Sequence, residues 1–130
     1  MGKKLMIFVD FDGTISKEDV CCSMVDRFAA EGWQDINRLW EEGALSTEEC
    51  AQQTLDIMTV SPDELESFFT SMEIDESFPD FVRWSRQNDY PLYIVSDGYD
   101  NYIDLLCKKY QLELPIYANH LEYRQGWQIE

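Results

Sequence analysis

The sequence feature that most constrains the fold is a pair of aspartates directly after an uncharged apolar run. Residues 5–9 read Leu-Met-Ile-Phe-Val, and Asp10-Phe11-Asp12-Gly13-Thr14 follows at once. A run that is apolar at every position predicts a strand buried on both faces, as in the parallel sheets of α/β proteins. Because such folds bind ligands in the crevice beyond the carboxyl ends of their strands, we expect the chemistry of this chain at Asp10 and Asp12.

The same arrangement recurs later in the chain. A second apolar run at residues 92–95 predicts a buried strand, and Ser96-Asp97-Gly98 follows it. Apolar residues at helical spacing from Ile103 to Tyr110 then predict a helix. Residues 115–118 are expected to form a third strand, and residues 121–129 a hairpin around Gln125-Gly126.

Helix-start signals fill the segment between the two aspartate-bearing regions. Ser16 followed three residues later by Asp19 predicts a first helix that ends at Gly32. Ser46-Thr-Glu-Glu49 is a capping box, and Ser61-Pro62 places proline at a first helical position. A further helix is expected from about Ser77 to Asn88. Residues 16–75 are therefore expected to be mostly helical.

Charge and cysteine usage narrow the classes of partner. The 26 acidic and 10 basic residues give a formal net charge of −16, which repels nucleic acid and anionic membranes, so we expect neither as a partner. A small anionic substrate needs a cation, of which Mg²⁺ is the obvious candidate, or aimed N–H groups. The four cysteines form no Cys-x-x-Cys pair and are expected to be reduced. The N-terminal apolar stretch is too short for a signal peptide or a membrane span, so we expect a cytoplasmic protein.

The aspartate motif carries a family resemblance. Asp10-x-Asp12 after a strand resembles the nucleophile motif of the haloacid dehalogenase superfamily, and Ser96 resembles its second motif. The run from Asp10 to Glu18 resembles the phosphoserine phosphatase branch. The whole chain looks like the first part of such a phosphatase, nearest to the methylthiopentenyl phosphate phosphatases of methionine salvage.

The resemblance implies a fold and a division of the chain. The expected fold is α/β, with a Rossmann-like parallel sheet and a small helical cap inserted after the first strand. Residues 1–15 and 76–130 would form the core, and residues 16–75 the cap. The expected activity is Mg²⁺-dependent hydrolysis of a phosphomonoester of a small phosphorylated metabolite. A non-catalytic binding or regulatory module, or another reaction such as phosphotransfer, stays open because the fold alone does not fix the reaction.

The residue types suit that chemistry. Asp10 is expected to attack phosphorus, with Mg²⁺ neutralising its charge, and Asp12 to protonate the leaving alkoxide and later deprotonate water. By resemblance, the backbone carbonyl of Asp12 joins Asp10 as a metal ligand, and Glu18 contacts the leaving moiety. Ser96 is expected to donate its hydroxyl to phosphate, and Asp97 and Gly98 their backbone N–H groups.

Two alternatives remain at the level of the residues. An Asp-Gly pair after a strand also occurs in ordinary turns. The residues Cys21, Cys22, Met24 and Trp33 fit either a cap pocket for an apolar or thioether substrate or a packed helix face.

Two expected motifs, a phosphate-binding lysine and a further acidic metal site, would by resemblance follow the last residues of this chain. We therefore expect residues 1–130 to be an N-terminal part that hydrolyses phosphate esters poorly by itself. The strand at residues 5–9 would keep an unpaired edge, and such an edge favours self-association.

Overall fold

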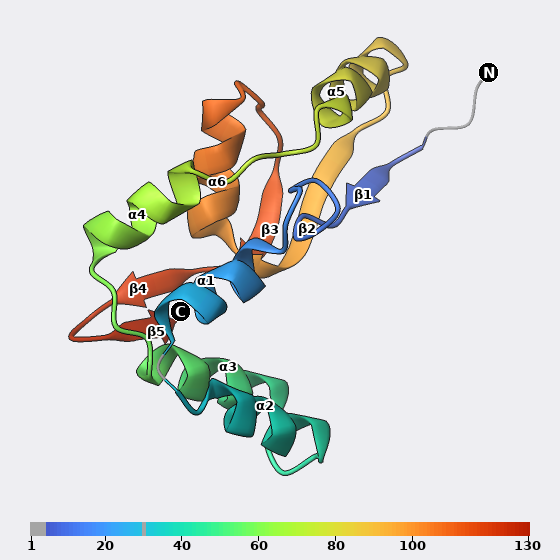
Figure 1. Ribbon diagram of the computed structural model, residues 1–130. Helices are drawn as coiled ribbons and strands as arrows, with labels where there is room; N and C mark the ends of the chain where they lie inside the picture. Colours follow the sequence, from blue (N-terminus) through green and yellow to red (C-terminus); the bar gives the residue numbers. More distant parts are fainter. Residues whose placement is uncertain (1–4, 30) are drawn as a thin grey trace.

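The computed structural model describes residues 5–29 and 31–130, and within them the chain is an α/β fold around a parallel sheet (Figure 1). The sheet has the strand order β1-β2-β3. Its strands are β1 (Ile7–Val9), β2 (Leu92–Tyr99) and β3 (Ile116–Asn119), and both neighbouring pairs are parallel. An antiparallel hairpin follows, formed by β4 (Leu121–Tyr123) and β5 (Trp127–Ile129). The expected fold class, third strand and hairpin are confirmed.

Helices fill the segment between β1 and β2 and follow β2. They are α1 (Val20–Phe28), α2 (Trp33–Glu41), α3 (Thr47–Asp56), α4 (Pro62–Thr70), α5 (Ser77–Gln87) and α6 (Asp100–Lys109). Figure 1 shows α2 and α3 far from the sheet, whereas α4 lies beside α6. The division into a core of 1–15 and 76–130 and a cap of 16–75 stays a prediction. In the described part of the chain no helix combines the length and apolarity needed to cross a membrane.

The helix starts follow the expected side-chain caps with one exception. Ser46 and Glu49 form the predicted capping box, and the Ser61 side chain accepts a hydrogen bond from a backbone amide of α4. The first helix begins after Asp19, not at Ser16, because Ser16 is buried and its hydroxyl is hydrogen-bonded inside the preceding turn. Gly32 does not end that helix but precedes α2 with a φ of 115°.

The sheet is buried on one face only, which corrects the expectation of burial on both. Ile94 is fully buried in the core with Ile103 and Leu106 of α6, whereas Phe8 is 62% exposed and Tyr117 is 60% exposed. Phe8 stacks on Tyr93 with ring centroids 5.4 Å apart, so the open face is aromatic. The physical reason is that the described chain supplies no element to cover this second face. Among the described residues β1 pairs only with β2 and so forms an edge of the sheet.

The second motif lies within β2 rather than after it. The strand was expected to end at Val95 but continues to Tyr99. Its register with β3 shifts between Val95 and Tyr99, so Ser96, Asp97 and Gly98 sit at an irregular stretch. The motif lies next to the turn that follows β1, because the Ser96 hydroxyl is hydrogen-bonded to Asp12 of that turn.

Candidate active site

A tight turn after β1 presents the two aspartates. The Phe11 carbonyl accepts hydrogen bonds from the amides of Thr14, Ile15 and Ser16 at 3.1, 2.9 and 3.1 Å. Phe11 is fully buried and anchors this turn in the core. Gly13 has a φ of 72°, a left-handed conformation that favours glycine. The turn leaves Asp10 exposed and Asp12 half-buried on either side of the Phe11 anchor.

The Asp12 carboxylate is held by donors from three separate elements. Its Oδ1 accepts hydrogen bonds from the backbone amides of Val20 (2.9 Å) and Cys21 (3.4 Å), in the first turn of α1. Its Oδ2 accepts one from the Tyr102 hydroxyl of α6 at 2.5 Å and one from the Ser96 hydroxyl of β2 at 3.4 Å. Amides at a helix N-terminus favour a negative group, so α1 stabilises this carboxylate. The two motifs, 84 residues apart in the sequence, are therefore in contact.

Burial and hydrogen bonding act in opposite directions on Asp12. Burial raises the pKa of its carboxyl above the usual value, while the bonds from Tyr102 and from the α1 amides lower it. Tyr102 is completely buried, and burial, together with the neighbouring Asp12 charge, raises the pKa of its hydroxyl. The tyrosine hydroxyl thus stays protonated and donates a hydrogen bond to Asp12.

The residues of the second motif hold one another in place. The Gly98 amide donates a hydrogen bond to the Ser96 hydroxyl oxygen at 2.9 Å, and the Asp97 carbonyl accepts one from the Asn119 side chain at 2.9 Å. A Cβ atom at Gly98 would overlap the Tyr102 hydroxyl and Asp12 Oδ2. Gly98 is therefore required by the close approach of these two side chains.

Asp10 and the backbone of Asp12 offer the oxygen ligands that Mg²⁺ takes. Asp10 is exposed, and its Oδ1 accepts a hydrogen bond from the Phe11 amide at 2.8 Å. The Asp12 side chain is occupied by its four donors, which leaves its carbonyl oxygen as the group suited to a cation. Mg²⁺ in phosphoryl-transfer sites is bound by one or two carboxylates, waters and substrate phosphates, and this donor set fits that pattern.

Glu18 lies in a different depression from the one that adjoins Asp12. Its carboxylate accepts a hydrogen bond from the Ser23 hydroxyl at 3.4 Å, and it lines a hollow with Lys17, Ser71, Met72 and Glu73. Lys17 is paired with Glu73 at 3.0 Å. The role of Glu18 toward a leaving group stays a prediction.

An apolar pocket adjoins Asp12 through Cys21, which lines the pocket and bonds to the Asp12 carboxylate. It has a volume of about 210 Å³ between α1, α2, α3 and the end of β2. Cys21 lines it and donates its amide to Asp12, and Tyr99 lines it directly after Gly98. The pocket is lined by uncharged side chains: Cys21, Cys22, Met24, Val25, Trp33, Asn37, Ala51, Thr54, Leu55 and Tyr99. Burial raises the pKa of Cys21 to about 12, so this thiol is uncharged as well.

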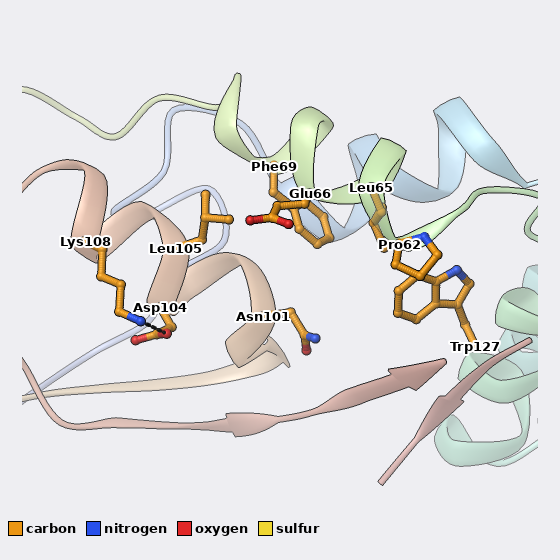
Figure 2. Close-up of a pocket in the computed structure, with 9 residues that line it drawn as sticks. All are labelled: Pro62, Leu65, Glu66, Phe69, Asn101, Asp104, Leu105, Lys108 and Trp127. Carbon is orange, nitrogen blue, oxygen red and sulfur yellow. Dashed lines mark ion pairs between the residues drawn. The ribbon is translucent and has the colours of Figure 1, made fainter. Parts of the chain in front are cut away.

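A larger hollow lies elsewhere, between α4, α6 and the hairpin (Figure 2). Its volume is about 420 Å³, and its wall carries Glu66 and the ion pair of Asp104 with Lys108. None of Asp10, Asp12 and Ser96 lines it. Volume alone therefore does not locate the chemistry of this chain.

Two residues of the site were not predicted from the sequence. Tyr102 was not singled out, and Tyr99 was not assigned to the pocket. The available signal was the polar end of a tyrosine on the inner face of the helix that directly follows the second motif, because a buried tyrosine hydroxyl needs a partner.

The comparisons with known proteins identify the class. The family model described as haloacid dehalogenase-like hydrolase matches residues 7–129, and the chain belongs to that family. The structure resembles a phospho-aspartyl intermediate analogue of phosphoserine phosphatase, with a TM-score of 0.74 and 22% identity over 99% of this chain and 64% of that one. That likeness establishes the fold.

Curated relatives carry more specific names. The chain is 33% identical over 129 residues to a 2-hydroxy-3-keto-5-methylthiopentenyl-1-phosphate phosphatase of Lysinibacillus sphaericus, covering 98% of this chain and 56% of the relative. It is 32% identical over 111 residues to Pdp3-interacting factor 1 of Schizosaccharomyces pombe, covering 83% of this chain and 48% of that protein. The chain thus spans about half the length of the curated relatives it matches. Its likeness is thus to part of a relative that is named as a phosphatase.

Proposed function

We propose that this chain carries the nucleophile and proton-transfer residues of a Mg²⁺-dependent phosphomonoester hydrolase that acts through an aspartyl-phosphate. One observation carries the proposal: the carboxylate of Asp12, two residues after exposed Asp10, accepts a hydrogen bond from the Ser96 hydroxyl at 3.4 Å, where the turn after β1 meets the irregular stretch of β2. This contact supports the proposal because it joins the proposed proton donor and the proposed phosphate-binding hydroxyl from two distant segments.

The proposed reaction has two halves. In the first, an Asp10 carboxylate oxygen bonds to phosphorus, the bond from phosphorus to the ester oxygen breaks, and Asp12 gives a proton to the departing alkoxide. In the second, Asp12 takes a proton from water, the water oxygen bonds to phosphorus, and the bond to Asp10 breaks to release inorganic phosphate. Asp12 thus acts once as acid and once as base.

The remaining motif residues hold the phosphate. With phosphate bound, Ser96 turns its hydroxyl from Asp12 to a phosphate oxygen, the Gly98 amide turns from Ser96 Oγ to the phosphate, and the Asp97 amide is a further donor. The Asp10 carboxylate and the Asp12 carbonyl would hold Mg²⁺, which would supply positive charge that offsets the charges of phosphate and nucleophile. These assignments are supported by the exposed Asp10 and by the four donors that fix Asp12.

The apolar pocket supports a small phosphate ester with an uncharged, apolar leaving group. Phosphoserine would bring an ammonium and a carboxylate, and burying either without a partner is costly. The pocket lining supplies no charged partner for them. A thioether chain fits thiol, methionine and indole surfaces, and the name of the Lysinibacillus sphaericus relative includes a methylthiopentenyl group. Phosphoserine is the second substrate to test.

Trapping tests the nucleophile. The protein is incubated with Mg²⁺ and fluoroberyllate, and the modified carboxylate is located in a crystal structure. We expect the adduct on Asp10, its loss in Asp10→Asn, and its retention in Asp12→Asn, which keeps the nucleophile. An adduct on another carboxylate would contradict the proposal. Hydrolysis is measured in parallel on the 130 residues and on any longer protein that contains them, because we expect the shorter chain to be poorly active.

A matched pair of variants tests the leaving-group pocket. Ala51→Leu on α3 adds side-chain volume inside the pocket. Gln53→Leu introduces leucine at an exposed position of the same helix and is the control. We expect Ala51→Leu to raise KM for 3-(methylthio)propyl phosphate and to leave inhibition by inorganic phosphate unchanged. Gln53→Leu is expected to change neither. Equal KM values in both variants would place the leaving group elsewhere.

The proposal extends to location and association. We propose a cytoplasmic protein that binds neither nucleic acid nor membrane, supported by its four free cysteines and its net charge of −16. Self-association through the β1 edge is supported by the exposed Phe8 and by the open side of β1. Light scattering tests it, and a monodisperse monomer across the concentration range would contradict it.

A further inference from the structure

We propose that Tyr102 is a positioning residue that holds the Asp12 carboxylate in its orientation for proton transfer. This inference rests on the proposed function, since it concerns the same carboxylate. It adds a residue of α6 that lies outside both sequence motifs.

The contact between the two side chains is short and buried. The Tyr102 hydroxyl donates a hydrogen bond to Asp12 Oδ2 at 2.5 Å, and Tyr102 has no exposed surface. Hydrogen bonds to a carboxylate are stronger than those between neutral groups. On the other side of the carboxylate, Oδ1 accepts the amides of Val20 and Cys21. The carboxylate is therefore fixed from both ends, by the start of α1 and by α6.

The ring of Tyr102 is itself fixed. Its centroid lies 5.2 Å from that of Phe69, 6.0 Å from that of Phe11 and 6.4 Å from that of Tyr99. A ring enclosed by three others has little rotational freedom, so its hydroxyl occupies one place. The other buried residues of α6, Ile103, Leu106 and Cys107, bring no oxygen into this core.

The backbone at Gly98 leaves room for the hydrogen bond between Tyr102 and Asp12. A Cβ atom at Gly98 would overlap both the Tyr102 hydroxyl and Asp12 Oδ2, so the glycine of the second motif makes room for the hydrogen bond. Ser96 Oγ also reaches Oδ2. The tyrosine thus directs Oδ2 toward the segment that carries the proposed phosphate-binding groups. A phenylalanine would fill the same core but leave this end of Asp12 with the weaker serine contact.

The test compares two leaving groups. An alkyl phosphate needs a proton on its departing oxygen, whereas p-nitrophenolate leaves without one. The comparison uses kcat/KM, which reports the steps up to departure of the leaving group and excludes the later base-assisted release of phosphate that both esters share. For Tyr102→Phe we expect kcat/KM to fall about 10- to 100-fold on 3-(methylthio)propyl phosphate, part of the roughly 10²–10⁴ that acid catalysis contributes, and to change little on p-nitrophenyl phosphate. Tyr110→Phe at the end of α6 is the control and leaves both rates unchanged. Equal losses on the two esters, or no loss on the alkyl ester, would overturn the proposal.

A crystal structure of Tyr102→Phe gives a readout that does not need turnover. We expect the Asp12 carboxylate to rotate away from its present place or to occupy two orientations. An Asp12 side chain unchanged in the variant would overturn the positioning role. Failure of the unaltered protein to hydrolyse either ester and to form an adduct on Asp10 would instead contradict the proposed function, and the variant structure then still decides whether Tyr102 orients Asp12.

Discussion

Gly98→Ala is the substitution with the most specific expected effect on this site. The backbone at Gly98 does not have a positive φ, so alanine meets no conformational penalty there. The whole cost comes from its Cβ, which would overlap the Tyr102 hydroxyl and Asp12 Oδ2 and lie 2.9 Å from the Tyr102 ring carbon Cζ. These three atoms must move, and the hydrogen bond between the two side chains breaks when they do.

The magnitude follows from two known costs. Overpacking a well-packed site costs about 1–3 kcal/mol in the free energy of unfolding. Loss of a hydrogen bond to a charged group in Tyr102→Phe costs about 1.5–3 kcal/mol. If the two substitutions acted independently, the double variant would lose about 2.5–6 kcal/mol. Because Gly98→Ala already breaks the bond that Tyr102→Phe removes, we expect the double variant to lose less than that sum, by about 0.5–3 kcal/mol.

Urea unfolding followed by circular dichroism measures these differences. The four proteins of the cycle, unaltered, two single variants and the double variant, are compared at equal m values, so that midpoint shifts report stability. Additive losses would show that Gly98 and Tyr102 do not share a contact. An unchanged free energy of unfolding in Gly98→Ala would refute the tight packing of Gly98 against Tyr102 and Asp12.

Three further substitutions have expected outcomes. Because burial raises the pKa of Asp12, the folded protein binds this proton more tightly than the unfolded chain does. The fold therefore loses stability as pH rises from about 3.8 through the raised pKa. Asp12→Asn is expected to raise Tm at pH 7 and to have little effect on Tm at pH 3. The hydrogen bond that His120 Nδ1 donates to Asp100 Oδ1 at 2.6 Å raises the pKa of His120, so this pair stabilises the fold below about pH 6.5 and its contribution is lost as pH rises through the raised value. His120→Gln should therefore lower Tm more at pH 6 than at pH 9, and an equal effect at both would contradict the pairing. Ser46→Ala removes the capping box with Glu49 and should cost about 1 kcal/mol in urea unfolding, with an unchanged midpoint counting against the cap.

Local patterns predicted the elements of this fold well. The apolar run before Asp10, the capping box at Ser46 and the proline at position 62 each act through neighbouring residues, and each gave the correct element. The predicted helix start at Ser16 was wrong because the Ser16 hydroxyl is hydrogen-bonded inside a buried turn. That turn also forms a β-bridge between Ser16 and Ile74, which is distant in the sequence. The prediction that the sheet is buried on both faces was wrong because an apolar sequence shows which residues can be buried. It does not show whether another element covers them.

In the candidate site, too, the residues marked by local sequence patterns were predicted and the contacts that depend on tertiary packing were not. Asp10, Asp12 and Ser96 could be predicted because each follows or lies in a recognisable strand. The contact of Tyr102 with Asp12 could not, since it depends on the exact docking of α6 beside the turn after β1. The pocket was only one of two alternatives for Cys21 and Trp33, because helical spacing cannot distinguish a packed face from one that lines a cavity.

The distance along the chain between the partners of Asp12 has a consequence for how the protein folds. Asp12 and Tyr102 are 90 residues apart. Closing a loop of that length costs about 4 kcal/mol in chain entropy beyond a constant, whereas α2 and α3 are joined by a short connection and pack on each other. The helices can therefore form in a chain whose first strand has not yet docked, and such a chain has normal helix content but no assembled carboxylate site. Helicity is accordingly a poor measure of complete folding, and the fraction of molecules in which the Tyr102 hydroxyl contacts Asp12 is the quantity that reports it.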